Sequence, residues 1–328
     1  MIDFSHFNSI FELTSYFNSE DKCKKAIFES RWNKKDVICP FCGQHHCTKR
    51  TDGRYHCSHC GANFSVLVGT IFENTKISLV KWFLAMYLIS SHKKGISSVQ
   101  LAKDIKVTQK TAWFILHKVR TLYVQNDTDN NLHGVVECDE MYLGGRETNK
   151  HESKKTEKTQ GRSTKTKTPI FGMAMVWNTK EEKANGEHYW KRHSLVNAVK
   201  VQDAKASTLI PIIEQFVAEG STIVTDELSA YNSLDKSKYN HVFVRHGEKE
   251  FVVGCYSTNG IEGFWGHFKR MVFGTYHFVS KVYLERYLDE AVYRFNTKEQ
   301  SESERFSYMF SKAMGNCYYK DVKLSLAA

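Results

Sequence analysis

Residues 135–139 have the sequence VVECD, and this run decides the fold class that we predict. Its short length and β-branched residues are typical of a strand, and it ends in Asp139. A second run of the same character, TIVTD at residues 222–226, ends in Asp226. Further strand patterns lie at 170–177, 191–197 and 241–245, and helical patterns at 206–219, 259–273 and 281–296. Strands that come first and helices that interleave later predict a mixed sheet covered by helices.

Three carboxylates, Asp139, Asp226 and Glu262, can converge in such a fold. Glu262 follows Asp226 after 35 intervening residues and lies in a helical pattern. Two acids at strand ends and one on a helix can hold two divalent cations, Mg²⁺ or Mn²⁺, which activate an attacking oxygen and stabilise the leaving oxygen of a phosphodiester. Magnesium suits the site because it prefers oxygen ligands and keeps positions for water and phosphate. The chain is therefore predicted to be an enzyme that cuts or joins DNA.

The two strand acids also have structural interpretations. Glu137 and Glu140 flank Asp139, so a different carboxylate of this run can be the ligand. Asp226 can simply begin a turn after its strand. All three acids, Glu262 included, fall at comparable ends of successive elements, which favours the metal site over unrelated structural roles.

Glu262 has an alternative of its own, because Asn259 and Glu262 fit a helix N-cap with its reciprocal partner. Helical periodicity places Glu262 and Lys269 on one face, two turns apart. Lys269 and Arg270 are then placed to hold the DNA phosphate next to the metals.

Four cysteines in the pattern CxxC, fourteen residues, CxxC predict a structural zinc site, and they are Cys39, Cys42, Cys57 and Cys60. Each pair bends the backbone so that two thiolates reach one ion, and two pairs complete a tetrahedron. Gly43 and Gly61 follow the pairs, where tight turns are needed. Because a closed four-thiolate site has no open position, this one zinc is expected to organise the fold and to take no part in catalysis.

Residues 97–113, SSVQLAKDIKVTQKTAW, have the pattern of two short helices joined by a turn, after a helix at 77–91 that we interpret as amphipathic. Thr108 can cap the second short helix. In a helix-turn-helix the start of that helix enters the major groove, so Gln109, Lys110 and Thr111 are the predicted DNA-reading residues. A plain helical hairpin with a polar outer face is the alternative. The neighbouring zinc module and the positive charge favour DNA.

The composition agrees with a folded chain that binds a polyanion. The chain has 328 residues, 41% of them hydrophobic, and a formal net charge of +10. A basic surplus favours phosphate contacts and counterion release, although it can also serve solubility alone. The segment 146–168 has eight Lys or Arg against three Glu, and is interpreted both as a solvated loop and as a basic arm that orders on DNA.

The cysteine spacing and the apolar runs bear on the compartment. The nine cysteines suit zinc in a reducing cytosol better than a disulfide framework. Residues 1–6 lack a signal-peptide pattern, and the longest apolar run, 82–89, is too short to span a bilayer. The expected location is the cytoplasm, in association with the nucleoid, without a membrane partner.

Together these residues resemble bacterial DDE transposases of insertion sequences, specifically the 1595 family with an N-terminal zinc ribbon, from about residue 20 to residue 297. The motifs are the zinc ribbon, ECDEMYLGG at 137–145, PIFGM at 169–173, TDE at 225–227, TNGIEGFW at 258–265 with the following Lys269 and Arg270, and the stretch 276–296. Relatives often have His before the Thr-Asn pair, whereas this chain has Ser257, and some have Asn in place of Glu262.

The resemblance implies an RNase-H-like core in which Asp139, Asp226 and Glu262 bind magnesium and Lys269 lies near DNA. It also implies recognition of double-stranded DNA, both element ends and target, by a homodimer or higher oligomer in a synaptic complex. The predicted fold is α+β or mixed, with a helical lead-in at 1–35, a zinc ribbon at 36–70, a helix-turn-helix domain at 71–130, a catalytic domain at 131–300 and a C-terminal tail at 301–328.

Three activities fit these residues. A transposase would cleave the inverted-repeat ends of its element and join the 3′-hydroxyl to target DNA. A catalytically inert regulator would bind the ends without cutting, and the intact acids count against it. A metal-dependent nuclease would hydrolyse DNA without joining.

Overall fold

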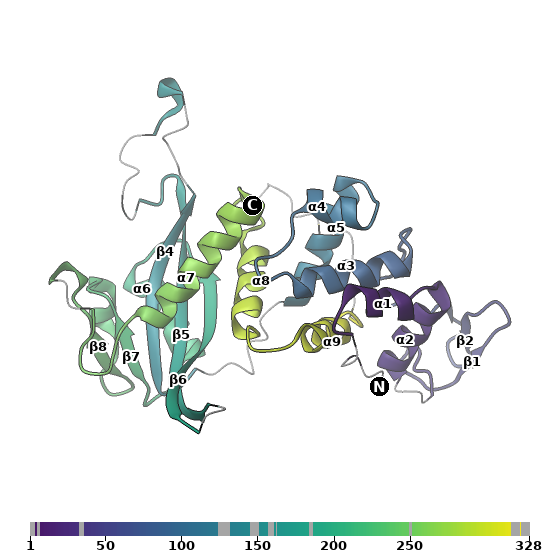
Figure 1. The fold of residues 1–328 in the computed structure, drawn as a ribbon, viewed down its shortest axis with the longest axis horizontal. Helices are drawn as coiled ribbons and strands as arrows, with labels where there is room; N and C mark the ends of the chain where they lie inside the picture. The colour runs from purple at the N-terminus through teal and green to yellow at the C-terminus, as the bar shows by residue number, and fades with distance from the viewer. Residues whose placement is uncertain are drawn as a thin grey trace. The chain divides into compact units, whose positions relative to one another are not determined.

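The computed structural model describes residues 4, 7–32, 36–123, 132–144, 151–156, 161, 163–183, 186–248, 251–315 and 322. Two units make up the chain, one from residues 1–124 and 297–328 and the other from residues 125–296 (Figure 1). Much of the predicted basic loop, at 146–150, 157–160 and 162, lies outside the described residues, as do residues 33–35 of the predicted lead-in.

A five-stranded mixed sheet organises the second unit, as the fold class predicted. Its order is β6-β5-β4-β7-β8. The antiparallel half contains β4, β5 and β6, and β7 and β8 continue the sheet parallel to β4. The strands are β4 (Val135–Gly144), β5 (Lys167–Glu182), β6 (His188–Lys200), β7 (Thr222–Thr225) and β8 (Asn240–Phe243).

The position of Asp139 in its strand differs from the prediction. Asp139 lies inside β4, which continues to Gly144, and does not end the strand. The parallel pairing with β7 stops at Glu137, but the antiparallel pairing with β5 runs along the whole of β4. Pairing with β5 therefore keeps β4 extended beyond Glu137, where pairing with β7 ends.

Helices cover both faces of this sheet (Figure 1). Met141 and Leu143 of β4 pack with α7 (Asn259–Met271) and α8 (Leu284–Asn296) in one core cluster. Val136 and Cys138 point to the opposite face and pack with α6 (Ala206–Phe216) in another cluster. This alternation follows from the two-residue period of a strand. It leaves the odd-numbered side chains of β4, Asp139 among them, on the α7 face.

The first unit contains a small antiparallel sheet and a group of helices around α3. Its elements are α1 (Ile10–Tyr16), α2 (Glu20–Trp32), β1 (Cys47–Lys49), β2 (Tyr55–Cys57), β3 (Asn63–Phe64), α3 (Leu79–Ser91), α4 (Ser98–Asp104), α5 (Gln109–Arg120) and α9 (Glu302–Lys312). The boundaries predicted between lead-in, zinc ribbon and helix-turn-helix stay predictions.

Helix α3 is buried on most of its surface, whereas an amphipathic helix was predicted at 77–91. Most of its residues are buried, because α1, α2, α5 and α9 all pack against it. The segment 301–328, expected to be a tail, supplies α9. Phe310 of α9 packs on Phe83 of α3, with ring centroids 5.0 Å apart. None of the helices within the described ranges is long and apolar enough to cross a membrane.

Candidate active site and zinc site

Asp139 lies under α7 and is held there by Trp265. The indole Nε1 of Trp265 donates a hydrogen bond to Asp139 Oδ2 at 3.0 Å. Gly172 of β5 is opposite Asp139 in the strand register. A Cβ at Gly172 would lie 2.6 Å from Cζ2 of Trp265 and 2.8 Å from Cδ1 of Ile261. The absence of a side chain at this position therefore lets α7 and its indole approach the sheet.

Asp226 reaches the same level of the sheet from β7. Glu137 pairs with Val224 in the parallel register, so two further residues along each chain bring Asp139 and Asp226 to neighbouring positions. Asp226 Oδ1 accepts the N–H of Leu228 at 2.9 Å. Asp226 does begin a turn, as its alternative interpretation expected, and this turn holds the carboxylate beside β4.

The three predicted acids interact through their charges. Burial and, next, the negative charge of Asp226 raise the pKa of Asp139 to about 6, although hydrogen bonds from the Glu140 backbone and Trp265 oppose the shift, and Glu262 makes a smaller raising contribution. Like charges brought together in this way favour either a shared proton or a bound cation. The carboxylate set thus fits a divalent cation by its chemistry, although its oxygens do not form a group as compact as the cysteines described below.

Glu262 lies in the first turn of α7 and is exposed. Thr258 Oγ1 donates to Glu262 Oε1 at 2.7 Å. The helix N-cap is Thr258, and its side chain accepts no capping hydrogen bond. The interpretation of Asn259 as the N-cap with Glu262 as its reciprocal partner is therefore wrong by one residue.

The neighbours of Asp139 in β4 have other partners. Glu137 is fully buried, and its Oε2 accepts the N–H of Gly260 at 2.6 Å and of Ile261 at 3.0 Å. Burial raises the pKa of Glu137, and the helix N–H groups and Arg192 oppose this shift. Glu140 accepts a hydrogen bond from the hydroxyl of Tyr231.

Because Glu137 and Glu140 have these other partners, Asp139 is the acid of β4 that lies beside Asp226. These contacts also identify Glu137 as a site residue to which sequence reasoning gave no such role. The only signal in the sequence was its spacing of two residues from Asp139 along a strand.

Lys269 and Arg270 are both exposed in the last turn of α7. Lys269 lies seven residues after Glu262, roughly 10 Å along the helix axis at a rise of about 1.5 Å per residue. Because seven residues are close to two full turns, Glu262 and Lys269 share a helix face, as predicted.

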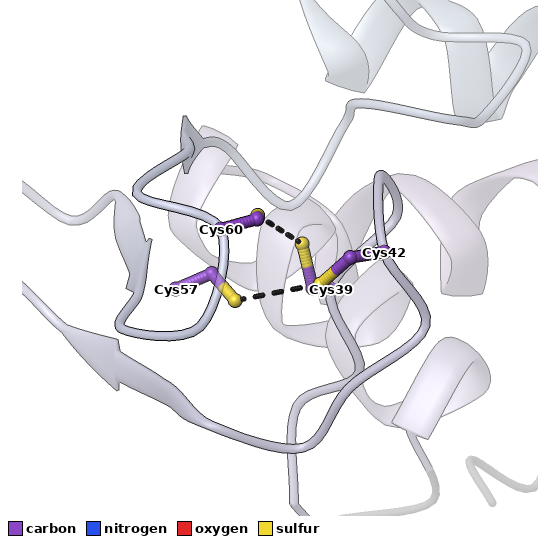
Figure 2. Close-up of side chains that lie close together, drawn as sticks. All are labelled: Cys39, Cys42, Cys57 and Cys60. Carbon is purple, nitrogen blue, oxygen red and sulfur yellow. Dashed lines mark hydrogen bonds between the residues drawn. The ribbon is translucent and has the colours of Figure 1, made fainter.

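The four predicted zinc ligands come together in the first unit. Their Sγ atoms all lie within 4.8 Å of one another, and within the described ranges no other group of potential ligands is as compact. Cys39 and Cys60 are 3.6 Å apart and Cys42 and Cys57 are 3.7 Å apart, measured between Sγ atoms (Figure 2). A tetrahedron with Zn–S bonds of about 2.3 Å requires edges of ~3.8 Å. The thiols therefore fit a zinc ion.

Local backbone geometry sets up this cluster. The N–H of Gly43 donates to the carbonyl of Cys39, and that of Gly61 to the carbonyl of Cys57, both at 2.9 Å. Both glycines have φ of 73°, the left-handed conformation that favours glycine. Backbone N–H groups of Cys60 and His59 also lower the pKa of Cys57 to about 6, which favours the thiolate that a metal needs.

The predicted helix-turn-helix corresponds to α4 and α5. Thr108 caps α5, since its Oγ1 accepts the N–H of Thr111 at 3.2 Å. Gln109 Nε2 donates to Ser98 Oγ of α4 at 2.7 Å, so its amide already has a partner inside the motif. Lys110 is exposed, and Thr111 is half-buried.

A four-cysteine cluster in one unit and a mixed sheet covered by helices in the other are the features of a transposase that carries a zinc ribbon. The sequence model of the ISXO2-like transposase domain matches residues 131–296, and that of the transposase zinc-ribbon domain matches residues 18–63. The chain belongs to this family, IS1595.

Two proteins of similar sequence agree with this assignment. A protein of the transposable element ISH50 from Halobacterium salinarum is 30% identical over 257 residues, covering 75% of this chain and 81% of the relative. A transposase-like protein from Haemophilus influenzae is 35% identical over 104 residues, covering 32% of this chain and 83% of that one. A solved pre-cleavage Mos1 transpososome aligns over 68% of this chain and 76% of its own, with 12% identity and a TM-score of 0.25.

Proposed function

We propose that this transposase cleaves the inverted-repeat ends of its insertion sequence and joins the resulting 3′-hydroxyl to target DNA, with Asp139, Asp226 and Glu262 as ligands of two magnesium or manganese ions. The observation that supports this most is that the parallel register of β4 and β7 brings Asp139 and Asp226 to neighbouring positions, where the charges of Asp226 and Glu262 raise the pKa of Asp139. Carboxylates that lie close together hold divalent cations well, because the cations remove the repulsion between their charges.

The chain's own residues position the reacting groups. Bound metals would activate the attacking oxygen and stabilise the leaving oxygen in an in-line displacement. The Trp265 indole fixes the orientation of Asp139, and the turn at Leu228 fixes Asp226. Lys269 and Arg270 would bind the DNA backbone along the exposed side of α7. The same arrangement serves both steps, because hydrolysis and joining differ only in whether water or a 3′-hydroxyl attacks.

The first unit would recognise the element ends. Lys110 stands exposed at the start of α5, where a recognition helix meets base edges. The structural zinc would hold the ribbon in a fixed shape for DNA contact. Two or more protomers would bring the two element ends together, and the basic segment at 146–168 would add affinity that weakens with salt.

Cleavage and joining of labelled end DNA test this proposal. Asp139→Asn should abolish Mg²⁺-dependent cleavage and leave end binding intact, because the substitution removes a metal-ligand charge and keeps the shape. Glu140→Gln is the matched control, since Glu140 flanks Asp139 in β4 but contacts Tyr231 instead. Wild-type cleavage by Asp139→Asn would refute the metal site.

An assay with precut end DNA distinguishes a transposase from a nuclease and from an inert regulator. Wild-type protein should join a precut 3′-end to plasmid target DNA. Cleavage without joined product would identify a nuclease, and end binding without cleavage would identify an inert regulator.

A further inference from the structure

We propose that Glu137 is a positioning residue that fixes α7 against β4 and thereby sets the distance between Glu262 and Asp139. This inference rests on the proposed function, because it concerns how two of the proposed ligands are brought together. Glu137 itself would touch neither metal nor DNA.

The first observation is what surrounds the Glu137 carboxylate. The side chain is fully buried, and one oxygen accepts the second and third N–H groups of α7, those of Gly260 and Ile261. The other oxygen pairs with the guanidinium of Arg192, which also lies 3.4 Å from Ser257 Oγ. A buried carboxylate is tolerated only when charge and hydrogen bonds compensate it. Here the N–H groups at the start of α7 supply hydrogen bonds and the positive end of the helix dipole, and Arg192 supplies the opposite charge.

The second observation is a matching contact one helical turn further along. Trp265 follows Ile261 by four residues and donates to Asp139, which follows Glu137 by two. Four helical residues advance about 6 Å, and two strand residues advance about 6.6–6.8 Å. Helix and strand therefore meet at two successive points, which fixes both the sliding and the rotation of α7. A slip of one turn would move Glu262 by about 5.4 Å.

The third observation is the close approach at Gly260. A Cβ there would lie 2.8 Å from Oε2 of Glu137 and 2.8 Å from Cγ1 of Val176. At Gly263, in the same helix turn, a Cβ would meet nothing within 4 Å. The helix start thus fits against Glu137 only without a side chain at residue 260.

A purely structural role of the Glu137–Arg192 ion pair would predict a different result. Its loss would lower folding stability and reduce DNA binding and cleavage in parallel. A positioning residue instead affects the cleavage rate of the bound complex more than end binding. The two roles can therefore be separated by measuring both quantities on the same variants.

The principal test compares Glu137→Gln with Glu140→Gln. We expect Glu137→Gln to slow single-turnover cleavage of bound end DNA by about 10- to 100-fold, as for other residues that orient metal ligands, while end binding is unchanged. Hydrogen exchange of the Gly260 and Ile261 amides should also become faster in the metal-free protein, because a neutral acceptor binds them less strongly. Glu140→Gln should change neither quantity.

Gly260→Ala and Gly263→Ala probe the same contact from the helix side, in case Glu137→Gln does not fold. Gly260→Ala should slow cleavage and Gly263→Ala should not. Wild-type cleavage by both Glu137→Gln and Gly260→Ala, or a loss of end binding equal to the loss of cleavage, would overturn the positioning role.

The two proposals fail in distinguishable ways. If Asp139→Asn abolishes cleavage while Glu137→Gln and Gly260→Ala behave as wild type, only the positioning role is wrong. If Asp139→Asn still cleaves, the metal site itself is wrong, and the exchange of the two α7 amides still reports whether Glu137 holds the helix.

Discussion

The zinc ribbon and the carboxylate site bring ligands together in different ways. In the ribbon, two knuckles of four residues each supply two thiols, and local turns at Gly43 and Gly61 orient them. At the carboxylate site, two strands and a helix each supply one acid from distant parts of the sequence. The first site is set up by local backbone geometry, whereas the second depends on strand register and on the seating of a helix.

The difference also extends to the chemistry. The thiols lie 3.6 and 3.7 Å apart in pairs and suit one ion in a closed shell. The acids are spread more widely and raise the pKa of Asp139. A spread, repelling set leaves room for phosphate and water, which a closed shell excludes. In this chain the compact cysteine ligands therefore suit a structural zinc ion, and the more widely spaced acids suit the catalytic metals that we propose.

The largest effect is expected in the ribbon. Cys42→Ser should reduce zinc from one ion per chain to none and unfold the ribbon, because structural zinc contributes about 10–16 kcal/mol of apparent binding free energy in small zinc domains. Metal analysis and hydrogen exchange of residues 36–70 would measure this. Cys47→Ser is the matched control in the same module and should keep its zinc. A full zinc content in Cys42→Ser would remove the contrast between the two sites.

Asp226→Asn should have the second-largest effect. We expect cleavage to fall about a thousand-fold or more, since stabilisation by a metal is worth several kcal/mol and each 1.36 kcal/mol is tenfold in rate. Zinc content should stay at one per chain, because the four cysteines and the three acids lie in separate units. A simultaneous loss of zinc would show that the sites are not independent.

Gly172→Ala tests whether the carboxylate site depends on helix seating. The added Cβ would clash with Trp265 and Ile261, and overpacking of this kind costs about 1–3 kcal/mol. The melting temperature of the second unit and the cleavage rate should both fall. Combining it with Trp265→Phe should recover part of the stability, because phenylalanine lacks the two indole atoms nearest to the new methyl group. An unchanged melting temperature in the single variant would contradict the close approach.

Trp265→Phe alone should have the smallest effect. It removes the N–H that donates to Asp139, and a hydrogen bond to a charged group is worth about 1.5–3 kcal/mol, part of which also supports the resting state. We expect roughly a tenfold slower cleavage and unchanged end binding. A rate equal to wild type would show that the turn at Asp226 and the register of β4 suffice to orient Asp139.

How far the sequence predicted each site follows the same division. The CxxC spacing was enough to identify the four cysteines that the structure brings together, because the geometry that unites them is local. The element types of the second unit were predicted too. The end of β4 differs from the prediction because pairing with β5 extends the strand. The start of α7 agrees with the prediction, and only its N-cap lies one residue earlier than the capping interpretation placed it.

Two errors in the first unit have different causes. The burial of α3 reflects four packed neighbours, which the pattern of a single helix does not reveal. Helix α9 did have local signals, since Ser301 and Glu304 form a capping box and Phe306, Met309 and Phe310 follow a helical spacing. These local signals indicate a helix in the segment that was predicted to be a tail.

Helix α9 has a consequence for synthesis on the ribosome. Phe306 and Phe310 cover Tyr87 and Phe83 of α3, yet they are translated only after the entire second unit. A nascent chain interrupted before residue 297 would expose that aromatic surface and should attract chaperones or proteases. The order of translation would thus disfavour truncated products that retain α3 without α9.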